Sequence, residues 1–96
     1  MTRQLTIDDA TVFNVAAKIT GHGKRTIRVY QSRDWKNRPG WMARAKATHY
    51  LTGDLVMRRT PEGYAWLKTW SAGEQPHFAT PQEALDAAIQ AGAVIA

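Results

Sequence analysis

Alternation of apolar and polar residues, interrupted by short turn signals, constrains this chain more than any other feature. Over residues 41–51 the odd-numbered positions are mostly small and apolar, while Arg44 and Lys46 stand at even-numbered positions. A period of two is typical of a β-strand whose two faces meet different environments. Thr52-Gly53-Asp54 and Thr60-Pro61-Glu62-Gly63 are rich in turn-forming residues. We therefore predict antiparallel strands at residues 26–31, 41–51, 55–59 and from 64 to about 70.

A helix is indicated near the end of the sequence. Thr80 precedes Pro81, and Glu83 follows three residues after the Thr, which is the pattern of a capping box with Pro at the first helical position. Small apolar residues then recur at helical spacing as far as Gly92, where a helix can end. This pattern predicts a helix over 81–91 that can lie close to a sheet.

Residues 8–20 support two interpretations. Asp8 or Asp9 can cap a helix that ends before Gly21. The same residues also alternate as a strand would, with Asn14 and Lys18 among the polar positions. The acidic cap favours a helix, and this is the alternative that we expect.

The length of 96 residues suits a single domain. We expect residues 1–96 to form one small α+β domain, an antiparallel β-meander of about four strands with the C-terminal helix packed on one face. The sequence contains no Cys, which excludes disulfides and thiolate metal sites. It also shows no apolar run of the length that a secretory signal or a membrane span needs, so we expect a cytoplasmic protein with no membrane partner.

Charge is distributed unevenly along the sequence. The formal net charge is +5, but residues 18–46 hold nine Lys and Arg against one Asp, and residues 69–96 hold three acidic residues and no basic ones. A concentrated basic segment is typical of proteins that bind polyanions. The alternative is a well-solvated surface loop.

The predicted sheet would collect basic and aromatic side chains on the face opposite the helix. Lys and Arg neutralise phosphates, and flat rings offer a stacking surface for unpaired bases. Two alternatives remain open: the aromatic residues may be core if residues 8–20 cover that face, or the face may bind a protein. The candidate nucleic-acid-binding residues are Lys24, Arg25, Arg28, Tyr30, Arg33, Trp35, Lys36, Arg38, Arg44, Lys46, Arg58, Tyr64, Trp66, Lys68 and Trp70.

Three segments together resemble a known pattern: Gly40-Trp41-Met42-Ala43-Arg44-Ala45-Lys46, the Thr52-Gly53 turn, and Phe78-Ala79-Thr80-Pro81-Gln82-Glu83-Ala84. They are similar to the three-stranded-sheet-plus-helix DNA-binding domains of plant ethylene-response factors and of the arm-binding regions of phage integrases. The resemblance covers about residues 28–91, and this chain adds the strand predicted from Tyr64. It implies DNA recognition by Arg28, Arg33, Trp35, Arg44 and Lys46. The helix junction is also similar to small accessory subunits of respiratory complex I.

Residue patterns for catalysis are missing from the sequence. His22, His49 and His77 lack the spacing of helical metal ligands, and Ser32 and Ser71 do not stand in a nucleophile-elbow context. Asp8 and Asp9 are adjacent and better placed to cap a helix than to act as an acid–base pair. We therefore expect no enzymatic activity, no cofactor and no metal.

These observations predict a small basic nucleic-acid-binding protein of phage or mobile-element type, with DNA preferred over RNA. The alternative is an interaction or inhibitor module that docks an acidic protein through the same face. A homodimer could form through an exposed edge strand, either 64–70 or 26–31.

Overall fold

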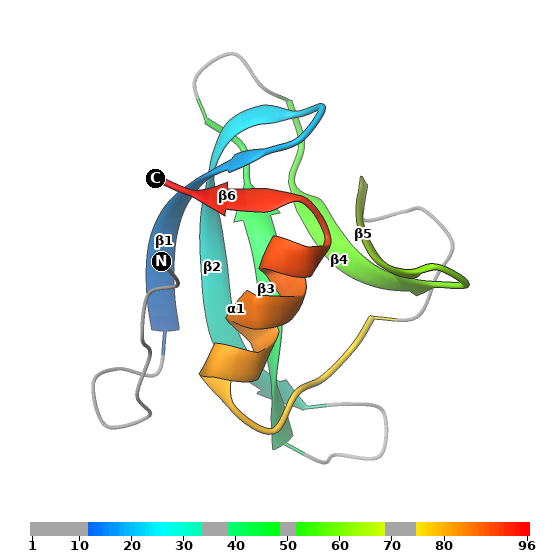
Figure 1. Ribbon diagram of the computed structural model, residues 1–96. Coiled ribbons are helices and arrows are strands. Elements are labelled where there is room, and N and C mark those ends of the chain that lie inside the picture. Colours follow the sequence, from blue (N-terminus) through cyan, green and yellow to red (C-terminus); the bar gives the residue numbers. More distant parts are fainter. Residues whose placement is uncertain (1–11, 34–38, 49–51, 69–74) are drawn as a thin grey trace.

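A curled antiparallel sheet, shaped like a half-barrel, forms most of the molecule, and one helix packs against it (Figure 1). The computed structural model describes residues 12–33, 39–48, 52–68 and 75–96. The strands lie in the order β5-β4-β3-β2-β1-β6. Their bounds, with that of the helix, are β1 Val12–Ile19, β2 Gly23–Arg33, β3 Pro39–Lys46, β4 Leu55–Thr60, β5 Gly63–Lys68, α1 Pro81–Gln90 and β6 Ala93–Ile95. The α+β class, the meander from β2 to β5 and the C-terminal helix are confirmed.

The first described segment is a strand, so the prediction of a helix at residues 8–20 is wrong. β1 pairs with β2 over eight residue pairs, from Val12 opposite Tyr30 to Ile19 opposite Gly23. Burial alternates strictly along β1, with Phe13 and Val15 in the core. The backbone hydrogen bonds of this long hairpin outweigh the signal of an acidic cap. Asp8 and Asp9 lie outside the described residues.

A sixth strand, β6, was not predicted. The turn at Gly92, where φ is +120°, ends the helix and returns the chain to the free side of β1. The backbone N–H of Thr20 donates to the Gly92 carbonyl at 3.0 Å. β2 consequently lies inside the sheet, and the prediction that residues 26–31 form an edge is wrong. β5 is an edge strand, as predicted for 64–70, although residues 69–70 lie outside the described part.

The helix begins as its capping box predicts. Thr80 Oγ1 accepts from the backbone N–H of Glu83 at 3.2 Å, and Glu83 Oε2 accepts from the backbone N–H of Ala79 at 3.1 Å. α1 lies across the sheet and turns small side chains toward it, including the fully buried Ala84 and Ala88 (Figure 1). Small residues allow close approach, so α1 and the sheet share one core.

The two-residue loop between β4 and β5 decides which face the last aromatic residues occupy. Thr60 pairs with Gly63, so Met57 pairs with Trp66 and even-numbered β5 residues share a face with odd-numbered β4 residues. Trp66 is only 5% exposed and belongs to the core. The prediction that Tyr64, Trp66 and Lys68 lie opposite the helix, with Ala65 and Leu67 on its side, is therefore wrong.

Among the described residues, no helix has the length and apolar character needed to cross a membrane.

Candidate nucleic-acid interface

Basic side chains gather on the face of the sheet that is turned away from α1, here called the outer face. Strand alternation fixes this face, because Val15, Ile27, Ala43 and Met57 point into the core and their neighbours point outward. We define the basic face as the cationic residues on the outward positions of β1 to β4: Lys18, Lys24, Arg28, Arg44, Lys46 and Arg58.

The register places cations directly opposite one another at two points of the basic face. Lys18 pairs with Lys24 across β1 and β2, and Arg28 pairs with Arg44 across β2 and β3. Like charges in directly opposed positions destabilise a sheet. An arrangement that opposes folding in this way provides a concentrated positive surface for a polyanion.

The Arg28–Arg44 pair lies between an aromatic ring and apolar neighbours. The guanidinium of Arg28 stacks over the Tyr30 ring, 5.5 Å from the ring centre. Arg44 is half-buried, and its Nε is buried without a hydrogen-bond partner. Next to this pair, Met42 and Val56 are buried although they point away from the helix-side core. The middle of the outer face is thus partly apolar, and both guanidinium groups are held in defined positions.

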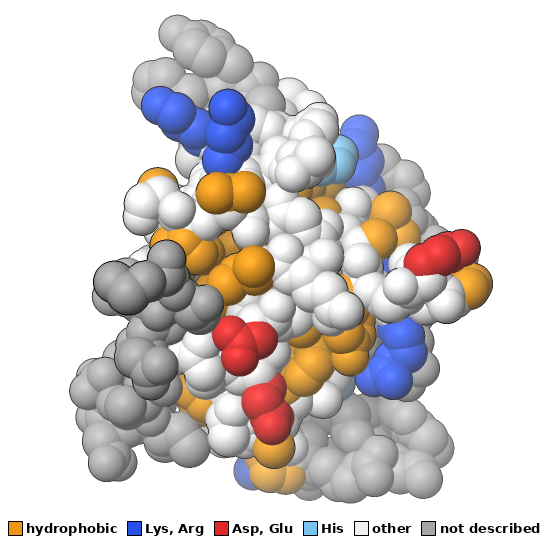
Figure 2. Space-filling view, in the orientation of Figure 1, with side chains coloured by type: hydrophobic (Ala, Val, Ile, Leu, Met, Phe, Trp, Pro, Cys, Tyr) orange, Lys and Arg blue, Asp and Glu red, His pale blue; other side chains and the backbone are white. Residues whose placement is uncertain are grey.

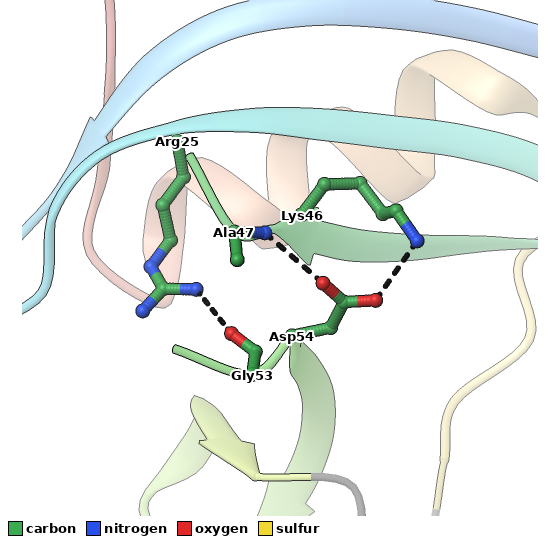
Figure 3. A network of polar contacts seen from close by, with 5 residues as sticks. All are labelled: Arg25, Lys46, Ala47, Gly53 and Asp54. Carbon is green, nitrogen blue, oxygen red and sulfur yellow. Dashed lines mark hydrogen bonds and ion pairs between the residues drawn. The ribbon is translucent and has the colours of Figure 1, made fainter. Parts of the chain in front are cut away.

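Asp54 supplies a counter-charge to one end of the basic face. Its carboxylate accepts from Lys46 Nζ at 2.9 Å and from the backbone N–H of Ala47 at 3.0 Å (Figure 3). These hydrogen bonds, that from Lys46 first, hold the pKa of Asp54 below its ordinary value of 3.8. The same contacts close the connection between β3 and β4, where only two residue pairs are formed. Lys46 is therefore partly neutralised, and the other cations of the basic face supply most of its charge.

The structure places the predicted site residues in three groups. On the outer face it brings together Lys24, Arg28, Tyr30, Arg44, Lys46 and Arg58. On the helix side, or buried, are Arg25, Arg33, Tyr64, Trp66 and Lys68. The remaining four, Trp35, Lys36, Arg38 and Trp70, lie outside the described residues.

The residues on the helix side have structural surroundings of their own. Arg25 is 5% exposed and its Nη1 donates to the Gly53 carbonyl at 2.8 Å, so the prediction that it grips phosphates at the surface is wrong. Tyr64 packs edge-on against Phe78, with ring centres 5.6 Å apart. Among the described residues, Tyr30 is therefore the aromatic side chain of the predicted set that the outer face retains.

Lys18 belongs to the basic face but was missing from the predicted site. Its signal was present in the sequence, because a strand over residues 12–19 places Lys18 on the same side as Asn14 and opposite Phe13 and Val15. Interpreting the segment as a helix hid its pairing with Lys24.

The opposite side of the molecule has a different charge. Figure 2 shows acidic side chains over α1 and basic side chains toward the margins of that view. The helix carries Glu83 and Asp86 and no Lys or Arg. A polyanion therefore meets repulsion on the α1 side and attraction on the outer face.

Within the described residues, no cluster of three or more His, Cys, Asp or Glu is arranged to hold a metal ion. Comparison with known proteins finds no matching family model, no matching curated protein and no matching solved structure.

Proposed function

We propose that this protein binds nucleic acid through the basic face. The observation that carries the proposal is the double juxtaposition of like charges, Lys18 with Lys24 and Arg28 with Arg44. Phosphates placed over these pairs would offset the repulsion and release counterions, which is the main sequence-independent source of affinity for DNA.

Double-stranded DNA is the target class that we favour. Proteins that bind single strands use several aromatic side chains as stacking platforms. On the described outer face only Tyr30 belongs to the aromatic set, and Arg28 already stacks on its ring. Cations spread over four adjacent strands instead suit phosphate contacts along a duplex. The resemblance to sheet-based DNA-binding domains, through Arg28 and Arg44, points to the same class.

The test is a fluorescence anisotropy titration of labelled 20-base-pair duplex and 20-nucleotide single strand over a series of salt concentrations. We expect micromolar binding to the duplex at low salt, with an affinity that falls steeply as salt rises, by about 0.9 in logarithmic slope for each phosphate contacted. Absence of binding to either oligonucleotide at low salt would contradict the proposal. It would leave an acidic protein as the partner of the same face.

A further inference from the structure

A pocket opens at the corner of the sheet where β1, β2 and β6 meet, and it is separate from the Arg28–Arg44 pair. Its volume is about 530 Å³, within the range of small-molecule sites. Ala16, Val94 and Ile95 supply apolar lining, and Lys18, Lys24 and Arg25 supply cationic lining. The pocket thus combines an apolar wall with three positive charges.

Arg25 is the feature of this pocket that a purely structural role leaves unexplained. The residue is 5% exposed, and among the described residues it forms no ion pair. Its one printed hydrogen bond runs from Nη1 to the Gly53 carbonyl, while its Nε is buried without a partner (Figure 3). Burying a charge is costly unless it is paired, and an orphaned buried donor requires an explanation. An anion bound in the pocket would provide both the counter-charge and the acceptor.

The apolar part of the pocket is open to a ligand from solvent. Val94 is 63% exposed, and it is the large apolar residue that stands out as exposed in the described structure. It lies directly opposite Lys18 in the pairing of β6 with β1. An apolar group resting on Val94 and Ile95 would therefore have a cationic side chain within reach.

We propose that this pocket binds a small amphipathic oxyanion, with its carboxylate or phosphate head on Arg25 and its apolar body against Val94 and Ile95. The fork of donors on a guanidinium matches the paired oxygens of either head group. Lys18 and Lys24 at the rim add attraction for the same charge. The apolar body is required, because most of the remaining lining offers no polar partner.

The experiment is an NMR titration of the full chain with hexyl phosphate, with hexanoate and with hexanol as the uncharged analogue. We expect saturable shifts of the backbone amide signals of Lys18, Val94 and Ile95 with one or both anions, and at least tenfold weaker binding of hexanol. The two anions separate a phosphate ligand from a carboxylate ligand. Equal binding of hexanol, or no saturable shift with either anion at millimolar concentration, would overturn the proposal.

Matched variants locate the binding. Val94→Glu places a carboxylate at the exposed mouth and should weaken anion binding at least tenfold, whereas Val94→Gln, of similar size and uncharged, should weaken it much less. Arg25→Gln should also abolish binding, but its contact with Gly53 can affect folding, so the Val94 pair decides. Similar binding by Val94→Glu and Val94→Gln would place the ligand elsewhere.

This site is independent of the proposed DNA function. Arg44→Gln lies outside the pocket lining, so it should reduce DNA affinity and leave the binding of hexyl phosphate unchanged. The pocket is contradicted if Arg44→Gln weakens both ligands equally, because hexyl phosphate would then be binding to the basic face.

Discussion

Arg28 and Arg44 stand directly opposite each other on the neighbouring antiparallel strands β2 and β3, on the face of the sheet that points away from the helix. The core beneath them fixes this juxtaposition, because Val29 pairs with Ala43 in the same register and both are buried. The two guanidinium groups cannot separate by a shift of register without exposing that core. The repulsion is thus maintained by packing, and a bound polyanion would relieve it.

Neutralising either Arg should weaken DNA binding in a way that salt reveals. Arg28→Gln and Arg44→Gln should each lower the slope of log affinity against log salt by about 0.9, the contribution of one phosphate contact. Anisotropy titrations of duplex DNA at several salt concentrations measure this slope.

Arg59→Gln is the matched control for this experiment. Arg59 is exposed on β4 but lies on the helix side, with its guanidinium 6.0 Å from the centre of the Tyr64 ring. The same loss of charge there should leave the slope nearly unchanged. Equal effects of Arg44→Gln and Arg59→Gln would show that total charge, rather than the basic face, determines affinity.

Reversing one charge of the other pair should stabilise the fold. Lys18→Glu converts a repulsive pair with Lys24 into an attractive one, so the free energy of unfolding should rise by about 0.2–1 kcal/mol at low salt. The gain should shrink in 1 M salt because the charges are exposed. Urea denaturation at both salt concentrations measures the change, and the same variant should bind DNA more weakly.

The double variant Lys18→Glu with Lys24→Glu completes the comparison. It restores a like-charge pair, so its stability should fall back toward that of the original chain. If the double variant is as stable as Lys18→Glu alone, the interaction of these two positions is not the cause.

The sequence was informative wherever a local signal coincides with the tertiary environment. The capping box at Thr80 and Glu83 predicted the start of α1, and alternation in β2 and β3 predicted that Arg28 and Arg44 share the outer face. Both signals act over a few residues, and the core reinforces both.

The errors arose where a distant partner decides the outcome. The strand β1 depends on its pairing with β2, and the three-residue β6 exists because β1 offers a free edge. The face of Trp66 follows from the register across the Pro61-Glu62 loop, which moves even-numbered residues of β5 to the helix side. Assigning β5 by the small size of Ala65 overlooked this change of parity.

Trp66 should therefore contribute to stability and not to DNA binding. Trp66→Leu removes most of a buried ring and should reduce the free energy of unfolding by about 3 kcal/mol. Trp66→Phe should cost less, because it preserves a ring and removes an indole N–H that has no hydrogen-bond partner. Chemical denaturation measures both, and duplex affinity of Trp66→Phe should equal that of the unmodified protein. A loss of affinity in the folded Trp66→Phe protein would restore the ring as a stacking surface.

The contacts of Asp54 predict how stability responds to acid. Because hydrogen bonds from Lys46 and Ala47 lower the pKa of Asp54 in the folded state, its contribution is fully present above the ordinary value of 3.8 and is lost as the pH falls through the lowered pKa. Asp54→Asn should thus reduce the free energy of unfolding by about 0.5–1.5 kcal/mol at neutral pH. The difference from the unmodified protein should shrink progressively as the pH falls below 3.8, which urea titrations over this range measure. Glu62→Gln, in the exposed loop before β5, is the matched loss of a carboxylate and should show no comparable difference at neutral pH. A constant difference between Asp54→Asn and the unmodified protein at every pH would mean that the shape of the side chain, and not its charge, closes the β3–β4 connection.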